Sequence, residues 1–180
     1  MPRRKNLYHG TLLRNLPLIE EQGLVPRIGT FTREFYGDAK GVVPAVFMAD
    51  LKGLDRVVHA MVAGIMDEVT EEDFEAYDIG PHYHLNDELF YKYGVIFVIE
   101  RDSSITLVGH SNADEPTQAE AGDWYALEVV RPIKAITGDD LCNFLAERDL
   151  TPSSINDFVD PFSVRSGTRI PAEPPISLLR

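Results

Sequence analysis

Apolar residues gather along this chain in runs whose spacing changes from one segment to the next. Short runs rich in apolar and β-branched residues predict strands. These runs are NLYH (6–9), VVPAVFMAD (42–50), GVIFVIER (94–101), WYALEVV (124–130) and IKAIT (133–137). A weaker run, SITLVGH at 104–110, is expected to pair with the strand over 94–101.

Helical signals occupy three other segments. The first helix has Asn15 as its N-cap and Pro17 in its first turn, and Gly23 ends it ahead of Pro26. We expect its apolar residues Leu16, Leu18 and Ile19 to face inward. A longer helix is predicted from about Leu51 to Val69, because apolar residues recur three and four positions apart there. Those residues are Leu54, Val57, Val58, Met61, Val62, Ile65 and Met66. GDDLCNFLAERD, at 138–149, predicts a short capped helix.

The remaining stretches have no clear period. Residues 25–41 read as a loop, and residues 70–94 as short helical turns and loop. The order of elements therefore indicates an α+β fold rather than the alternating pattern of a doubly wound sheet. We expect a single domain over 1–150 and a Pro- and Ser-rich arm over 151–180 that packs on the domain or trails from it. Neither GxGxxG, GxxxxGK[ST] nor GxSxG occurs, which argues against several nucleotide-binding and hydrolase classes.

Composition narrows the choice of class further. The 180 residues carry a net charge of −12, which disfavours a broad nucleic-acid surface because phosphate binding needs clustered Lys and Arg. One cysteine, Cys142, rules out an internal disulfide and a cysteine-rich metal site. No apolar run reaches the length that spans a bilayer, and the start lacks the apolar region of a secretory signal. These features favour a cytoplasmic protein, or one delivered into a target cytosol without a signal peptide.

Four blocks in order carry a resemblance to a known family. They are LYHGT, the helix ending EEQGLVP, AVFMAD followed by a helix, and GDWYALEVVRPIKAI. Together they resemble the ADP-ribosyltransferase superfamily of the His-Tyr-Glu type, which includes the poly-ADP-ribose polymerases and shares its core with the RNA 2'-phosphotransferases. The resemblance covers residues 6–137 as separate blocks. It implies an ADP-ribosyltransferase-like core, a mixed or antiparallel split β-sheet with flanking helices, and NAD as co-substrate.

The resemblance also implies roles at the NAD site. His9 matches the histidine that hydrogen-bonds the adenosine ribose, by donating to its hydroxyls, and Gly10 the glycine whose backbone contacts the nicotinamide amide, with Thr11 beside them. Phe47 stands at the family tyrosine in VFMA, so the ring is kept and the hydroxyl is lost. Tyr36 is expected to shape the pocket.

A carboxylate completes the expected site. Asp123 matches the family glutamate, one methylene shorter, and Glu120 in the preceding loop and Glu128 further along are the alternatives. Such an acid stabilises the oxocarbenium-like state through which the nicotinamide–ribose bond breaks. Arg27 is expected near the cofactor phosphates, in the same loop as Arg33. The departures from the family pattern argue against polymer formation and favour single transfer.

The sequence therefore predicts a mono-ADP-ribosyltransferase that moves ADP-ribose from NAD to a macromolecular acceptor, with protein favoured over nucleic acid. By analogy with the family, a toxin, an effector or a phage-encoded modifier fits such a chain. A non-catalytic NAD- or protein-binding relative and an RNA 2'-phosphotransferase-like enzyme stay open. A metal-dependent hydrolase built on PHYHLNDE is a further alternative, with His82, His84, Asp87 and Glu88 as ligands and His59 and His110 as more distant ones. We expect no metal and no membrane contact.

Overall fold

The computed structural model describes residues 6–27, 44–66, 68–76, 87–107 and 123–153. These residues form helices and strands around one antiparallel sheet, so the expectation of an α+β fold is confirmed. No helix within the described ranges combines the length and the apolar character needed to cross a membrane.

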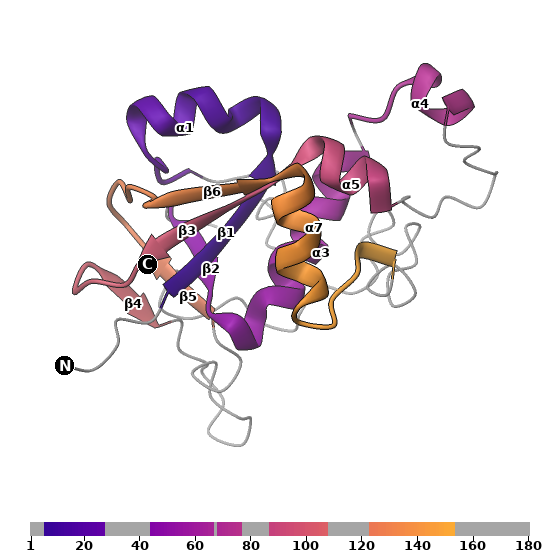
Figure 1. The fold of residues 1–180 in the computed structure, drawn as a ribbon. Coiled ribbons are helices and arrows are strands. Elements are labelled where there is room, and N and C mark those ends of the chain that lie inside the picture. The colour runs from indigo at the N-terminus through magenta and orange to yellow at the C-terminus, as the bar shows by residue number, and fades with distance from the viewer. Residues whose placement is uncertain (1–5, 28–43, 67, 77–86, 108–122, 154–180) are drawn as a thin grey trace, which may run out of the picture.

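Six strands make up the sheet, in the order β4-β5-β2-β1-β3-β6, and every pairing between neighbours is antiparallel (Figure 1). Their bounds are β1 Asn6–Leu12, β2 Val46–Ala49, β3 Gly94–Glu100, β4 Ile105–Leu107, β5 Asp123–Ala126 and β6 Lys134–Thr137. Five of the strands were predicted from clear apolar runs, and β4 from the weaker run SITLVGH. Two short 3-10 turns, Leu13–Asn15 and Leu51–Gly53, lead into helices.

Strand β3 is buried and lies between β1 and β6 in the sheet. Its residues from Gly94 to Ile99 are all buried, as expected for a continuous apolar run, and it pairs with β1 over seven residues. Because β1 lies on one side of β3 and β6 on the other, β3 has no free edge. The expectation that SITLVGH pairs with this strand was wrong: β4 pairs with β5 instead.

Helices cover both faces of the sheet. On one side lies α1, Leu16–Gln22; on the other lie α3, Leu54–Met66, α5, Asp87–Tyr93, and α7, Gly138–Ala146 (Figure 1). Two apolar clusters result, one between the sheet and α3, α5 and α7, the other between the sheet and α1. The stripe predicted for the long helix is confirmed, since its apolar residues are buried except for the partly buried Met66.

Helix α1 follows its sequence signals with two differences. Pro17 lies in its first turn, and Gly23 ends it with a φ of 81°, a left-handed conformation that favours glycine. Asn15 occupies the N-cap position, but its side chain makes no capping hydrogen bond. Ile19 is buried and Leu16 packs partly, whereas Leu18 is 43% exposed, so the inward prediction for Leu18 was wrong.

The short helix α4, Glu71–Ala76, is attached to α5 through one buried carboxylate. Asp73 is 2% exposed and accepts hydrogen bonds from Lys92 Nζ and Tyr93 Oη, both at 2.7 Å. It also accepts from the Thr70 backbone N–H and hydroxyl, while the Asp73 N–H donates to Thr70 Oγ1, which is a capping box. These donors, with Lys92 the largest influence, hold the pKa of Asp73 well below its usual range.

Candidate functional site

The three residues expected to form the core of the site lie on three neighbouring strands. His9 is in β1, Phe47 is in β2, and Asp123 is the first residue of β5, and β1, β2 and β5 are consecutive in the sheet. Tyr8 pairs with Ala49, and Ala49 pairs with Asp123, so one row of Cα positions crosses all three strands; it contains Asp123 and runs one residue from His9 and two residues from Phe47. With strands about 4.8 Å apart, this row spans about 10 Å. Blocks far apart in sequence are therefore adjacent in the fold.

A hydrogen bond links the first two of these residues. The imidazole Nδ1 of His9 lies 2.7 Å from the backbone carbonyl oxygen of Phe47. Within β1 and β2, which are described in full, Tyr8 and Ala49 form the single pair in register. The ring of His9 thus bonds to the neighbouring strand next to the point where regular pairing stops.

This hydrogen bond fixes the tautomer of the ring. A carbonyl oxygen only accepts, so Nδ1 carries the proton and donates. Burial lowers the pKa of His9, the Phe47 carbonyl opposes that effect, and the positive charge of Arg27 lowers the pKa further. The ring is therefore neutral at pH 7, and Nε2 presents a lone pair. A hydroxyl that approaches Nε2 would therefore find an acceptor there, whereas the expected role of His9 was that of a donor.

Gly10 lies inside the strand rather than at its end. The predicted strand was NLYH, but β1 continues to Leu12 because Gly10, Thr11 and Leu12 pair with Ile96, Val95 and Gly94 of β3. A Cβ on Gly10 would lie 2.3 Å from Met61 Sδ and 2.8 Å from Val57 Cγ1. The close approach of α3 to β1 therefore requires this glycine whether or not a ligand is bound.

Thr11 is held from the following turn. The side-chain amide of Asn15 donates to Thr11 Oγ1 at 3.0 Å. Asn15 therefore bonds to the candidate site instead of capping α1. Since Thr11 Oγ1 accepts from Asn15, its own O–H points elsewhere as a donor.

Phe47 packs in a small aromatic cluster with Tyr125 and Ala45. Phe47 and Tyr125 are directly opposite each other in the β2–β5 pairing, and Tyr125 is 8% exposed. Sequence reasoning did not include Tyr125. Its position two residues after Asp123 in DWYA was the available signal, because residues i and i+2 share one face of a strand.

The structure separates the candidate acids. Asp123 begins β5 beside Ala49. Glu128 was expected on a strand, but β5 ends at Ala126 and Glu128 lies in the exposed segment that follows it. Glu120 lies outside the described residues, as do Tyr36 and Arg33. Arg27 is described: it forms a β-bridge with Ala45, just before β2, and its charge reaches His9.

The rival metal segment is described only from Asp87 onward. Asp87 accepts hydrogen bonds from the Ser153 N–H at 2.8 Å and the Ser153 hydroxyl at 3.2 Å, which gives this carboxylate a structural role. His82, His84 and His110 lie outside the described residues. Within the described ranges, no three His, Cys, Asp or Glu side chains are grouped so that they could hold a metal ion.

Comparison of the chain with family models, with curated proteins and with solved structures finds no match.

Proposed function

We propose that this protein is a mono-ADP-ribosyltransferase with NAD as co-substrate and a macromolecular acceptor, protein in preference to nucleic acid. The observation that carries the proposal is the arrangement of His9, Phe47 and Asp123 on three consecutive strands, with His9 bonded to the Phe47 carbonyl. Three blocks of sequence suggested these residues independently of their spatial arrangement. The single registered pair between β1 and β2 supports the split sheet core that the proposal implies.

Each of these residues takes one role in the proposed reaction. His9 Nε2 accepts from a ribose hydroxyl of NAD, and the Phe47 ring packs against the nicotinamide end. Arg27, near enough for its charge to influence His9, attracts the cofactor phosphates. Asp123 stabilises the positive charge that develops on the ribose as nicotinamide leaves. The acceptor nucleophile then attacks the ribose carbon from which nicotinamide has departed.

The test is nicotinamide release and label transfer from adenine-labelled NAD, with a cell extract as acceptor. We expect label to appear on macromolecules, and we expect protease digestion to release this label while RNase digestion leaves it in place. Asp123→Asn should lower the rate by about 10²-fold or more, a magnitude typical of a group that stabilises transition-state charge. Glu128→Gln is the matched control, because Glu128 lies at the other end of β5, and it should leave the rate unchanged.

A non-catalytic NAD-binding relative is the second candidate. The observation that favours it is the pair of departures at Phe47, which lacks a hydroxyl, and Asp123, which is one methylene shorter than the family acid. In that case the chain binds NAD without releasing nicotinamide, and the double variant Phe47→Tyr, Asp123→Glu gains turnover. If neither turnover nor NAD binding is seen in the wild type, both candidates are wrong. Stable label in RNA would instead name nucleic acid as the acceptor, and loss of activity with a chelator would favour the metal-hydrolase alternative.

A further inference from the structure

A second surface of the molecule has the features of a docking site. Six large apolar side chains of the described residues are exposed, and three of them belong to one segment that follows β5: Leu127, Val129 and Ile133. Along this segment Val129, Arg131 and Ile133 face outward while Val130 is buried, so the alternation presents apolar side chains to solvent. A strand that only covers a core shows polar residues on that side.

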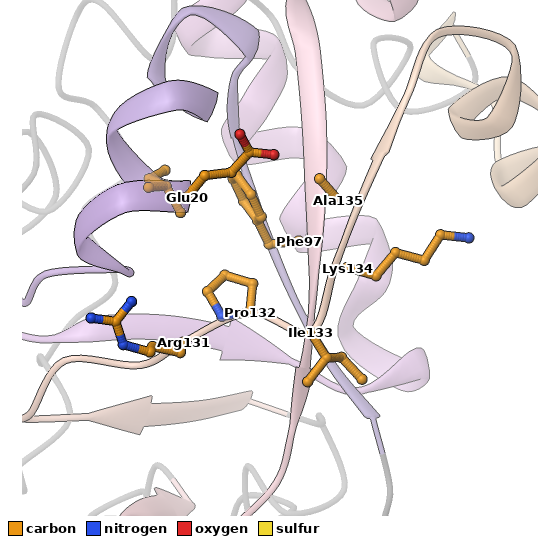
Figure 2. Close-up of a pocket in the computed structure, with 8 residues that line it drawn as sticks. Glu20, Phe97, Arg131, Pro132, Ile133, Lys134 and Ala135 are labelled. Atoms are coloured by element: carbon orange, nitrogen blue, oxygen red, sulfur yellow. The ribbon is translucent and has the colours of Figure 1, made fainter.

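The same segment borders a hollow of about 220 Å³ between α1 and β6. Ile19, Phe97, Pro132 and Ala135 provide most of its apolar lining, and Ile133 lies at its side. Figure 2 shows Arg131 and Lys134 on either side of Pro132, with Glu20 reaching over the hollow from α1. Two cations and one carboxylate therefore line a hollow on a molecule whose net charge is −12.

Strand β6 adds backbone groups to this surface. In the described part of the chain the sheet ends at β6, which has β3 as a neighbour on one side and no strand on the other. An exposed strand edge pairs readily with an extended segment of another chain. A lysine on such an edge discourages pairing with apolar or basic strands, and an acidic residue on the incoming strand removes that penalty.

We infer that β6 and the hollow beside it bind an extended segment of a partner protein in which apolar residues alternate with acidic ones. The segment continues the sheet past β6, places an apolar side chain in the hollow next to Ile133, and pairs its acidic groups with Lys134 and Arg131. A second copy of this chain is disfavoured as the occupant, because two molecules of charge −12 repel each other. Arg131 also lines a second hollow, of about 510 Å³, together with Glu100 and Asp102. Their negative charges disfavour an acidic segment there, so we place the acidic groups of the partner on the β6 side.

The test uses the isotope-labelled full chain and two short synthetic peptides, one in which Val alternates with Glu and one in which Val alternates with Lys. We expect the Val/Glu peptide to shift the amide signals of Ile133, Lys134 and Ala135. Lys134→Glu should weaken this binding by about tenfold or more, as removal and reversal of a charge contact does. Lys52→Glu makes the same charge change on an exposed residue before α3 and should leave binding unchanged.

Several outcomes would overturn the inference. Equal or tighter binding of the Val/Lys peptide, shifts confined to other surfaces, or no shift with either peptide would each do so. Self-association of the chain that moves the same amide signals would identify a second copy as the occupant instead. Both variants should melt at the wild-type temperature, which separates loss of binding from loss of folding. Because no assay here involves NAD, the result is independent of the proposed transferase activity.

Discussion

At the scale of single residues, one hydrogen bond determines what His9 can do. Donation from Nδ1 to the Phe47 carbonyl leaves Nε2 as an acceptor, and the lowered pKa keeps it so at neutral pH. The same bond also joins β1 to β2. Loss of His9 therefore combines a structural effect with a binding effect, and a useful variant must separate the two.

His9→Asn makes this separation. The Asn amide N–H occupies nearly the place of Nδ1–H and keeps the bond to the Phe47 carbonyl, but nothing replaces Nε2. We expect a free energy of unfolding within about 1 kcal/mol of the wild type and an NAD affinity lower by about tenfold or more. His9→Ala, the comparison variant, should lose both. Calorimetric titration with NAD and denaturant unfolding measure the two effects; normal NAD affinity in His9→Asn would contradict the role of Nε2.

The lowered pKa of His9 gives a prediction for pH. The folded chain binds fewer protons here than the unfolded chain between the lowered pKa and 6.5, so stability is full above pH 6.5 and declines as the pH falls through this window. His59, whose pKa is also lowered by burial, contributes in the same direction. Arg27→Gln removes a positive charge and should raise the pKa of His9. An NMR titration of the His9 ring measures it, and an unchanged or lower value would contradict the influence of Arg27.

At the scale of elements, the sequence predicted the individual helices and strands better than it predicted which strands pair. The apolar stripe of α3, the glycine stop of α1 and the apolar run of β3 are properties of consecutive residues, so the sequence predicts them directly. The extent of β1 and the partner of β4 depend on strands far away in the chain. The predicted strand stopped at residue 9 because the strand partners of Gly10 and Thr11, which are Ile96 and Val95, are not visible locally.

Gly10 is a position where a single residue determines the packing of two distant elements, because α3 packs directly on it. Gly10→Ala should lower the free energy of unfolding by about 1–3 kcal/mol, since its Cβ would overlap Met61 and Val57. When Met61 is also replaced by Ala, Gly10→Ala should cost less free energy of unfolding than it does beside Met61, because the overlapping sulfur is gone. Urea unfolding of the four combinations gives the coupling. A Gly10→Ala chain of normal stability that fails to bind NAD would mean that the glycine serves the ligand rather than the helix.

At the scale of the whole molecule, the sheet order could not be predicted, yet it assembles the candidate site. Resemblance placed His9, Phe47 and Asp123 in one site, and the sequence alone offered no reason why the strands of 6–12, 46–49 and 123–126 should be neighbours. Apolar periodicity indicates which face of a strand is buried, but not which strand lies beside it. Local spacing put Tyr125 on the same face as Asp123, but its packing against Phe47 became known only from the order of the sheet.

Charge also acts at the scale of the whole molecule and predicts how stability responds to salt. Three ion pairs within the described residues, Arg14 with Glu68, Arg56 with Asp55 and Arg148 with Glu147, each include at least one largely exposed side chain, and such surface pairs contribute little. The excess acidic side chains, which give the net charge of −12, repel one another and destabilise the folded state. Screening should therefore remove more repulsion than attraction. Raising NaCl from low salt to about 0.15 M, where the Debye length is about 8 Å, should increase the melting temperature by about 2–4 °C. Calorimetry measures the change, with KCl as the control for ion-specific effects. A melting temperature that falls with salt would mean that paired charges outweigh the excess of acid.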